Sequence, residues 1–528
     1  MRTAAVALTV LLATALAAPA SATAAWQVSE AEAVRSADRD AKVLREEAAK
    51  GPLAPVARKT EGHWEVGYFT AGDEVAVVLV DPATGEVTES WTGHQVAWKM
   101  ARGYSGAFGH KLNAPYVFLP LCALFLLGLV DWRRWRRVAN LDLLVLLAFG
   151  VSHYFFNRAE IGVSVPLQYP VLLYLLGRAL WIGFRGGGEG IRPIWPAAWL
   201  LIAALFLLGF RAGLNVADSG AIDVGYASVV GADRISQGEP VYDNFPDDVS
   251  QGDTYGPVNY LAYVPFELVW PWAGSWDDLP AAHGAAIGFD VVTFLLLILL
   301  GIRIRPGPAG RLLGATLAFG WAAYPYTAFA LESNSNDTLV AALLVAALLV
   351  LARPLARGAV AALAVWAKFA PVLLAPMLAT YRPSAAFRSH SPGNAARVRV
   401  SLGFVGAFVL ATAVLLAWPA IDPGLGTFYE RTLAYQGGRD SPFSIWGQVP
   451  ALEPLRIALL LGAVALSLAL AFVPRRKSLV QVAALGAALL IAVQLTMQHW
   501  FYLYVVWFYP LLLLAFARPP ESPPAART

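Results

Sequence analysis

Long apolar runs follow one another along the chain from residue 114 to residue 516. The run at 284–302, "GAAIGFDVVTFLLLILLGI", is close to the ~20 residues that a helix needs to cross a bilayer. Of the 528 residues 58% are hydrophobic and only 14% are charged, which is too little charge to cover a soluble domain of this length. We therefore expect an all-α polytopic membrane protein with about eleven transmembrane helices. The expected spans are 114–130, 141–156, 167–181, 195–210, 284–302, 312–331, 338–351, 402–417, 455–473, 479–495 and 501–516.

Basic clusters after alternate spans predict the orientation of the chain. "DWRRWRR" follows the first span and "PRRKS" precedes the tenth, and such clusters favour the cytoplasmic side. The opposite face then carries the acidic stretch 215–257, "ESNSND" at 332–337, the loop 422–448 and "QHWFY" at 498–502. Nearly all side chains suited to chemistry are therefore expected on the extracytoplasmic face, with the carboxyl-terminal tail inside.

The amino-terminal part resembles an exported segment. "AAVALTVLLATALAA" and an A-x-A site in "APASATAAW" predict a signal peptide over 1–24, and an uncleaved first helix is the alternative. In the soluble stretch 25–109, Ser29 and Glu32 form a capping box that opens a helix over 29–50. The alternating segments "HWEVGYFT" and "EVAVVLV", then "DPATGEV" and "TESWTG", predict a small antiparallel sheet.

The segment 358–382, "GAVAALAVWAKFAPVLLAPMLATYR", does not fit a simple span. Basic residues at both ends place both ends inside, yet it is too short for two crossings of ~20 residues each. Pro371 and Pro376 interrupt helix geometry, which predicts a re-entrant or broken-helix hairpin with Lys368 near its apex. A lysine at that depth needs a partner carboxylate or a water-filled cavity. It is either half of a structural ion pair or a cation for an anionic ligand such as a phosphate.

Motifs in two parts of the sequence resemble those of known families. "DPATGEV" at 81–87 is similar to the late strands of PepSY modules. "IDVGYASVVGADRISQGEPVYD", "TYGPVNYLAYVPF" and "WAKFAPVLLAP" resemble motifs of GT-C glycosyltransferases that use polyprenyl-phosphate sugars, especially bacterial mannosyl- and arabinofuranosyltransferase-like families. The resemblance implies a PepSY-like domain at 25–109, additional helices at 110–194, a GT-C-like domain at 195–517 and a tail at 518–528.

The resemblance to GT-C enzymes also implies roles for particular residues. Asp223 occupies the position of the catalytic aspartate that accepts the acceptor's hydroxyl proton, and Asp218 is the alternative. Lys368, Arg439 and His499 are candidates for the donor phosphate, although Arg439 could instead pair with Asp440 and His499 could belong to an interfacial aromatic belt. The candidates for substrate contact are Tyr226, Tyr255, Asn336, Asp337 and Trp446.

The expected activity is inverting transfer of a sugar, with mannose favoured, from a polyprenyl phosphate to a lipid or glycan acceptor of the cell envelope. We expect no metal, no cofactor and no nucleic-acid partner, and a location in the cell membrane. Two alternatives remain open: a secondary transporter, which needs polar groups within several helices, and a PepSY-coupled sensor or assembly factor. The sequence leaves the identity of the sugar and of the acceptor open.

Overall fold

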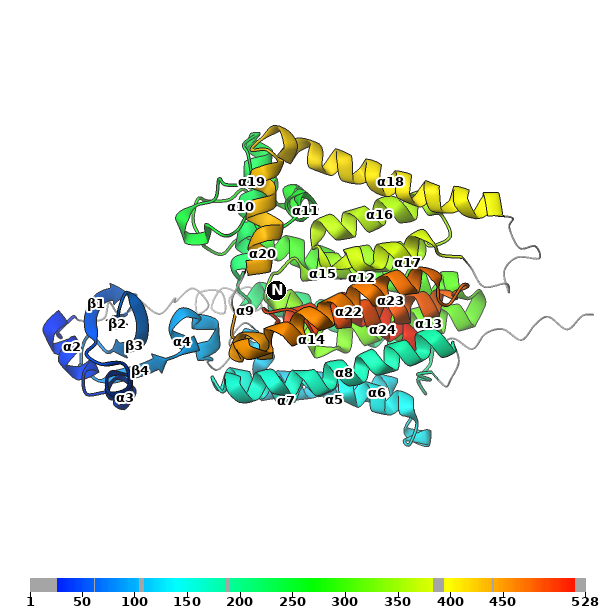
Figure 1. Ribbon diagram of the computed structural model, residues 1–528. Helices are drawn as coiled ribbons and strands as arrows, with labels where there is room; N and C mark the ends of the chain where they lie inside the picture. Colours follow the sequence, from blue (N-terminus) through cyan, green and yellow to red (C-terminus); the bar gives the residue numbers. More distant parts are fainter. Residues whose placement is uncertain are drawn as a thin grey trace, which may run out of the picture. The chain divides into compact units, whose positions relative to one another are not determined.

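The computed structural model describes residues 26–60, 62–103, 109–186, 190–382, 394–438 and 441–517. It has two compact units, Met1–Arg102 and Gly103–Thr528. The described part is mostly helical and contains a small antiparallel sheet, as the sequence predicted (Figure 1). The expected signal peptide and the carboxyl-terminal tail lie outside the described residues.

In the first unit, two short helices precede a four-stranded sheet. The expected capping box is present, because the Ser29 backbone N–H donates to Glu32 Oε2 at 2.9 Å. The helix predicted over 29–50 is two helices, since Asp40 accepts the Lys42 backbone N–H at 2.8 Å and so begins a second one. The elements are α2 (Glu30–Ala37), α3 (Ala41–Lys50), β1 (Ala54–Thr60), β2 (His63–Thr70), β3 (Asp73–Val80), β4 (Val87–Thr92) and α4 (His94–Ala97).

Strands pair in chain order, β1-β2-β3-β4, and alternate side chains fill one core. Trp64 and Val66 of β2 pack with Val78 of β3 against Ala33 and other residues of α2. Strand β1 was not predicted, because its sequence "APVARKT" lies at the sheet edge and is mostly exposed.

The second unit consists of helices, and each of the eleven expected segments overlaps at least one of them. The longer ones are α5 (Pro115–Leu129), α6 (Val138–Leu147), α7 (Phe149–Asn157), α8 (Ile161–Arg185), α9 (Ala197–Asp218), α10 (Asp223–Gln237), α11 (Pro257–Glu267), α12 (Pro280–Ile304), α13 (Gly307–Ala323), α14 (Pro325–Glu332), α15 (Asp337–Leu349), α16 (Pro354–Ala367), α18 (Asn394–Ile421), α22 (Glu453–Phe472), α23 (Leu479–Gln494) and α24 (Val505–Ala517).

Six helical stretches in the described residues are long and apolar enough to cross a bilayer. They are Val138–Asn157, Ile161–Arg185, Ala197–Asp218, Pro280–Ile304, Val398–Ile421 and Pro450–Phe472. The others are shorter: α15 has 13 residues, and at a rise of 1.5 Å per residue it spans about 20 Å of the ~30 Å hydrocarbon core. The helices are compatible with a multi-pass membrane protein, and the count of eleven spans stays a prediction.

Some helices are buried, whereas others expose an apolar surface. Helices α14, α23 and α24 are buried along most of their length. In contrast, only 6% of the apolar window of α18 is buried, and Leu402, Leu410 and Val414 are among its exposed side chains. An apolar surface of that kind is one that a bilayer would cover.

The expected break near Lys368 is present. Helix α16 ends at Ala367, and η5 (Ala370–Leu374) and α17 (Ala375–Ala379) follow with Pro371 and Pro376 in their first turns. Both short helices pack back against α16, so the chain turns at Lys368. The depth of this turn in a bilayer stays a prediction.

Candidate functional site

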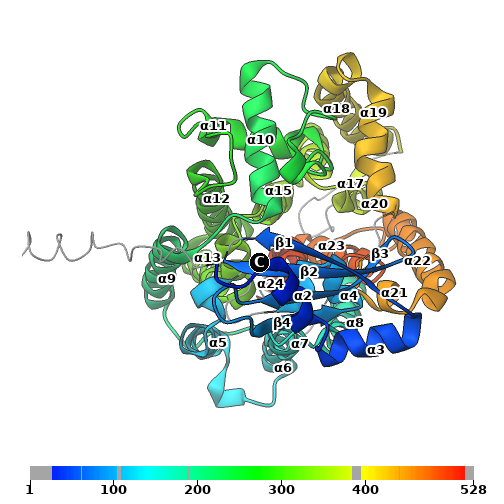
Figure 2. The same cartoon turned by 90° about the vertical axis from the view of Figure 1, so that its left-hand side faces the viewer.

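A pocket of about 220 Å³ lies between the first turns of helix α10 and the loop that joins α10 to α11. These elements stand at one end of the long apolar helices (Figures 1 and 2). Three carboxylates are among the lining residues, and no lysine or arginine is. The lining residues are Asp223, Ala227, Asp247, Asp248, Val249, Ser250, Gln251, Gly252 and Tyr255.

Asp223 is held at the pocket by the start of α10. It is the first residue of that helix, and its carboxylate accepts the backbone N–H of Val224 at 2.9 Å. The preceding residue, Ile222, donates its N–H to the carbonyl of Ser333 at 3.2 Å. The amino-terminal end of α10 is therefore fixed to the loop between α14 and α15, and this contact positions Asp223.

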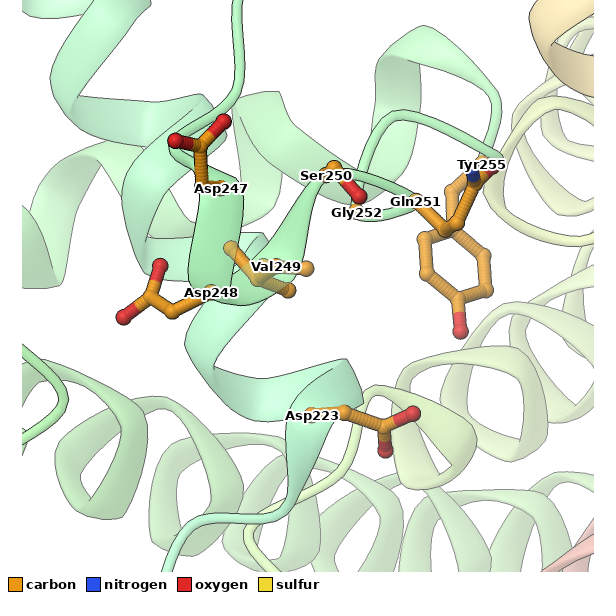
Figure 3. A pocket seen from close by; sticks show the side chains of 9 residues that line it. Asp223, Asp247, Asp248, Val249, Ser250, Gln251, Gly252 and Tyr255 are labelled. Atoms are coloured by element: carbon orange, nitrogen blue, oxygen red, sulfur yellow. The ribbon is translucent and has the colours of Figure 1, made fainter. Parts of the chain in front are cut away.

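Figure 3 shows how the acidic side chains are oriented. The carboxylate of Asp223 and the ring of Tyr255 face each other across the pocket, whereas Asp247 and Asp248 point away from Asp223. Asp248 accepts a hydrogen bond from the Tyr226 hydroxyl at 3.0 Å. Burial and this bond raise the pKa of Tyr226 to about 12. Tyr226 is fully buried, so its predicted contact with substrate would act through Asp248 rather than directly.

Lys368 lies beside the pocket in a box of aromatic rings. Its ammonium is 5.5 Å from the ring centre of Tyr255, 5.3 Å from that of Tyr504 and 5.0 Å from that of Trp507. It also forms an ion pair with Asp337, whose Oδ1 accepts the Trp507 indole N–H at 2.7 Å. Cation–π contacts and a carboxylate together stabilise the positive charge. Because Asp337 is fully buried, it supports Lys368 instead of lining the pocket.

The loop at 333–336 is polar but buried throughout. Asn336 donates to the side-chain oxygen of Asn259 in α11 at 2.7 Å, and Asn215 in α9 donates to the side-chain oxygen of Asn334 at 2.8 Å. Buried amides of this kind are stable only when they are hydrogen-bonded. The network joins α9, α11 and the start of α15. It engages the amide nitrogen of Asn336, which the sequence assigned to substrate, and leaves Asn336 Oδ1 without a hydrogen-bond partner among the described residues.

His499 comes close to the Lys368 box. Its Nδ1 lies 3.0 Å from the hydroxyl of Ser441, and its ring centre is 6.4 Å from that of Tyr504. His499 and Lys368 therefore both approach the ring of Tyr504. Arg439, the third candidate for the donor phosphate, lies outside the described residues.

Two other expected site residues have structural partners. Trp446 is 3% exposed and donates its indole N–H to the carbonyl of Leu495 at 2.9 Å, so its ring has no open face for a sugar. Asp218 forms an ion pair with Lys111 at 3.1 Å and is not among the residues that line the pocket. Of the two candidate bases, only Asp223 faces the pocket.

Arg431 is a candidate that sequence reasoning missed. Its Nε donates to the buried carboxylate of Asp253 at 2.6 Å, and a second guanidinium N–H donates to the carbonyl of Ser250 in the pocket wall. It thereby attaches the segment 422–438 to the acidic loop. Loop 422–448 contains two arginines, Arg431 and Arg439, and nothing in the local sequence distinguishes which of them meets an acid.

Among the described residues, no group of three or more His, Cys, Asp or Glu side chains is placed to hold a metal ion. A scan of protein-family models and a search of curated proteins each found no match to this chain.

Gly225 provides a test of how Asp223 is positioned. A Cβ at Gly225 would lie 2.4 Å from the backbone oxygen of Asn334, so alanine should push α10 away from the 333–336 loop. We expect Gly225→Ala to lower stability by roughly 1–3 kcal/mol, as overpacking does, with loss of activity. Gly213→Ala in α9, where a Cβ meets open space, is the control. Equal melting temperatures for the two variants would contradict the close packing.

Proposed function

We propose that the protein is a membrane glycosyltransferase that transfers a sugar, with mannose favoured, from a polyprenyl phosphate to a lipid or glycan acceptor. One observation carries the proposal. A carboxylate, Asp223, and an ammonium, Lys368, approach the same aromatic residue, Tyr255, at one end of a set of apolar helices. A base and a cation at a membrane-adjacent pocket are what such a transfer needs.

The proposed chemistry divides the site into two halves. A sugar on a polyprenyl phosphate already has a good leaving group, so the enzyme needs a base for the acceptor hydroxyl and positive charge for the departing phosphate. Asp223 would take the proton while the acceptor oxygen attacks the anomeric carbon from the face opposite the phosphate, with inversion. Lys368 would hold the phosphate, with His499 and Arg439 as further candidates, and the reaction as proposed uses no cofactor.

Charge supports this division. Three carboxylates line the pocket, so a phosphate is repelled from its centre and must lie toward a cation. Two cations among the described residues contact the pocket wall: Lys368 contacts Tyr255, and Arg431 contacts Ser250. The uncharged hydroxyls of an acceptor sugar suit the acidic half, where Tyr255 offers an aromatic face.

The direct test is incorporation of label. Purified full-length protein is incubated with radiolabelled polyprenyl-phosphate mannose and a lipid extract, and the products are separated by chromatography. The proposal predicts a labelled lipid or glycan that is absent with Asp223→Asn. If mannose is not incorporated but polyprenyl-phosphate arabinofuranose is, the enzyme class stands and the sugar changes. If neither donor is used, the proposal fails.

Sidedness is the next prediction. We expect the pocket outside the cell and the basic loops inside, because the basic clusters follow the positive-inside rule. In a variant with Cys122 replaced by serine, Gln251→Cys should react in intact cells with a thiol reagent that cannot cross the membrane. Arg311→Cys should react only after permeabilisation. Gln251 and Arg311 are both exposed, so the side of the membrane on which each lies decides whether the reagent reaches it. If Arg311→Cys reacts in intact cells and Gln251→Cys does not, the orientation is the opposite of the one proposed.

A secondary transporter is a second candidate that one observation favours. Arg211 of α9 and Asp290 of α12 form an ion pair at 2.9 Å, and both are buried within candidate spans. Glu332 interacts electrostatically with both of these residues and is fully buried. Neither of its carboxyl oxygens has a hydrogen-bond partner among the described residues. Intramembrane charges of this kind often mark transport paths. A transporter would move labelled sugar across reconstituted vesicles, and Glu332→Gln would stop that movement.

A further inference from the structure

The buried cations of the described residues divide into two groups. Three of the five buried Lys and Arg side chains have a carboxylate partner within ion-pair distance, and two do not. The paired ones are Arg137 with Asp131, Arg211 with Asp290 and Lys368 with Asp337. The two without a carboxylate partner are Arg357 and Lys477.

Arg357 lies in the first turns of α16 and is 1% exposed. One guanidinium N–H donates to the carbonyl of Leu351, while Nε and Nη2 have no hydrogen-bond partner among the described residues. The guanidinium lies 5.3 Å from the ring centre of Tyr381 and 5.7 Å from that of Phe404. Arginine does not lose its proton in proteins, so burial leaves a positive charge with two donor nitrogens, which carry three N–H groups, unused.

Lys477 is 2% exposed and donates from its ammonium to the carbonyl of Pro474 at 2.7 Å. Its backbone N–H donates to the carbonyl of Arg382 at 3.2 Å, and Arg382 directly follows the Tyr381 that Arg357 contacts. Burial, with a smaller contribution from the charge of Arg382, lowers the pKa of Lys477 to about 8. Arg382 is half-buried and forms no ion pair with a described residue. Lys477 and Arg382 therefore carry interacting positive charges, and Arg357 contacts Tyr381, the residue beside Arg382.

This cluster is remote from the Asp223 pocket. Arg357 is near the beginning of α16 and Lys368 follows its end, so the cluster and the pocket belong to opposite ends of that helix. Figure 1 shows α10 at one end of the apolar helices and the amino-terminal end of α18 at the other. Lys477 follows α22, whose candidate span ends at Phe472.

Buried positive charge without a counterion is costly, and a ligand anion removes that cost. Arginine binds a phosphate with two parallel N–H bonds, and an ammonium adds a point charge. We infer that Arg357, Arg382 and Lys477 form a site for a phosphate group at this end of the helices. The inference is independent of the proposed transferase activity, because none of the three residues contacts the pocket.

Two sources supply the same chemistry: the headgroup of an anionic phospholipid and free inorganic phosphate. The surroundings favour the lipid. Leu355 in the first turn of α16 and Leu402 in α18 are each 64% exposed, and Gly358 packs directly on the backbone of Phe404 beside Arg357. A headgroup at Arg357 would thus have apolar helix surface next to it for its acyl chains.

The test uses delipidated full-length protein in detergent. Phosphatidylglycerol, phosphatidylcholine and inorganic phosphate are titrated separately while the melting temperature is followed, and native mass spectrometry counts retained lipid. We expect phosphatidylglycerol to raise the melting temperature and to remain bound. Lys477→Met should weaken its apparent affinity about tenfold or more, which is the usual effect of losing a hydrogen bond to a charged group. Arg311→Met, which removes an exposed charge from the first turns of α13, should not.

The outcomes separate the sources. If inorganic phosphate protects the protein as well as phosphatidylglycerol does, and Lys477→Met weakens that protection, the site takes a free anion. If phosphatidylcholine equals phosphatidylglycerol, or Lys477→Met and Arg311→Met behave alike, the inference is overturned. The lipid affinity of Arg357→Met is interpreted only if the variant folds. The wild-type and Lys477→Met titrations test the inference without it. A failure of the phosphate site in these titrations would not change the incorporation of labelled mannose, which tests the Asp223 pocket separately.

Discussion

Replacement of Asp223 by asparagine is expected to lower the rate of sugar transfer by about 100-fold or more, the usual contribution of a positioned general base. Asparagine has nearly the same volume but cannot accept the acceptor's hydroxyl proton. The side chain is exposed at the start of α10, so the fold should be little affected. Initial rates with labelled donor, together with the melting temperature of the purified variant, check both parts of this expectation.

Two matched variants make the Asp223 result specific. Asp278→Asn removes the same charge from an exposed loop outside the pocket and should leave transfer unchanged. Asp218→Asn breaks the ion pair with Lys111 and should act mainly on stability. Near wild-type transfer in Asp223→Asn, combined with loss of transfer in Asp218→Asn, would move the catalytic base to Asp218.

Replacement of Lys368 by methionine is expected to have two separable effects. It leaves the buried carboxylate of Asp337 without its cation, and breaking a buried pair in this way costs about 3–5 kcal/mol of stability. It also removes the proposed contact with the donor phosphate, which should weaken donor affinity by roughly 1.5–3 kcal/mol. Methionine keeps the apolar stem, so the aromatic box can still close around the side chain. Donor and acceptor titrations with a melting curve measure both effects.

The double variant Lys368→Met with Asp337→Asn separates structure from function. Removing both charges leaves no uncompensated carboxylate, so much of the lost stability should return. Donor affinity should stay low, because the ammonium is still absent. If the double variant recovers donor affinity together with stability, Lys368 is a structural ion-pair residue and the phosphate site belongs to His499 or to an arginine of loop 422–448.

Much of the fold follows from the order of residues along the chain. The 284–302 run fills the middle of α12, and the prolines at 371 and 376 coincide with the break after α16. These features are local, since they depend on apolar length and on the backbone of proline. Helix lengths were less predictable: the expected span 338–351 is the 13-residue helix α15, because buried neighbours rather than lipid surround it.

The candidate site was predictable only in part, because its contacts join residues distant in sequence. Asp223 could be selected by its motif, and Tyr255 does line the same pocket. No local pattern indicates that Lys368 meets Asp337, or that Arg431 meets Asp253 across 178 residues. The sequence also suggested that polar groups gather at one face, whereas the Arg211 and Asp290 pair lies within the helices. Buried pairs of this kind are set by helix packing.

The ion pair between Lys368 and Asp337 has a consequence for how the chain is made. A charged side chain that enters the bilayer without a partner adds to the free-energy cost of inserting its helix. Asp337 begins α15 and leaves the ribosome first, while its partner Lys368 follows α16 and is synthesised 31 residues later. We therefore expect α15 to remain at the translocation channel until α16 joins it, so that the two helices enter the bilayer together with their charges already neutralised.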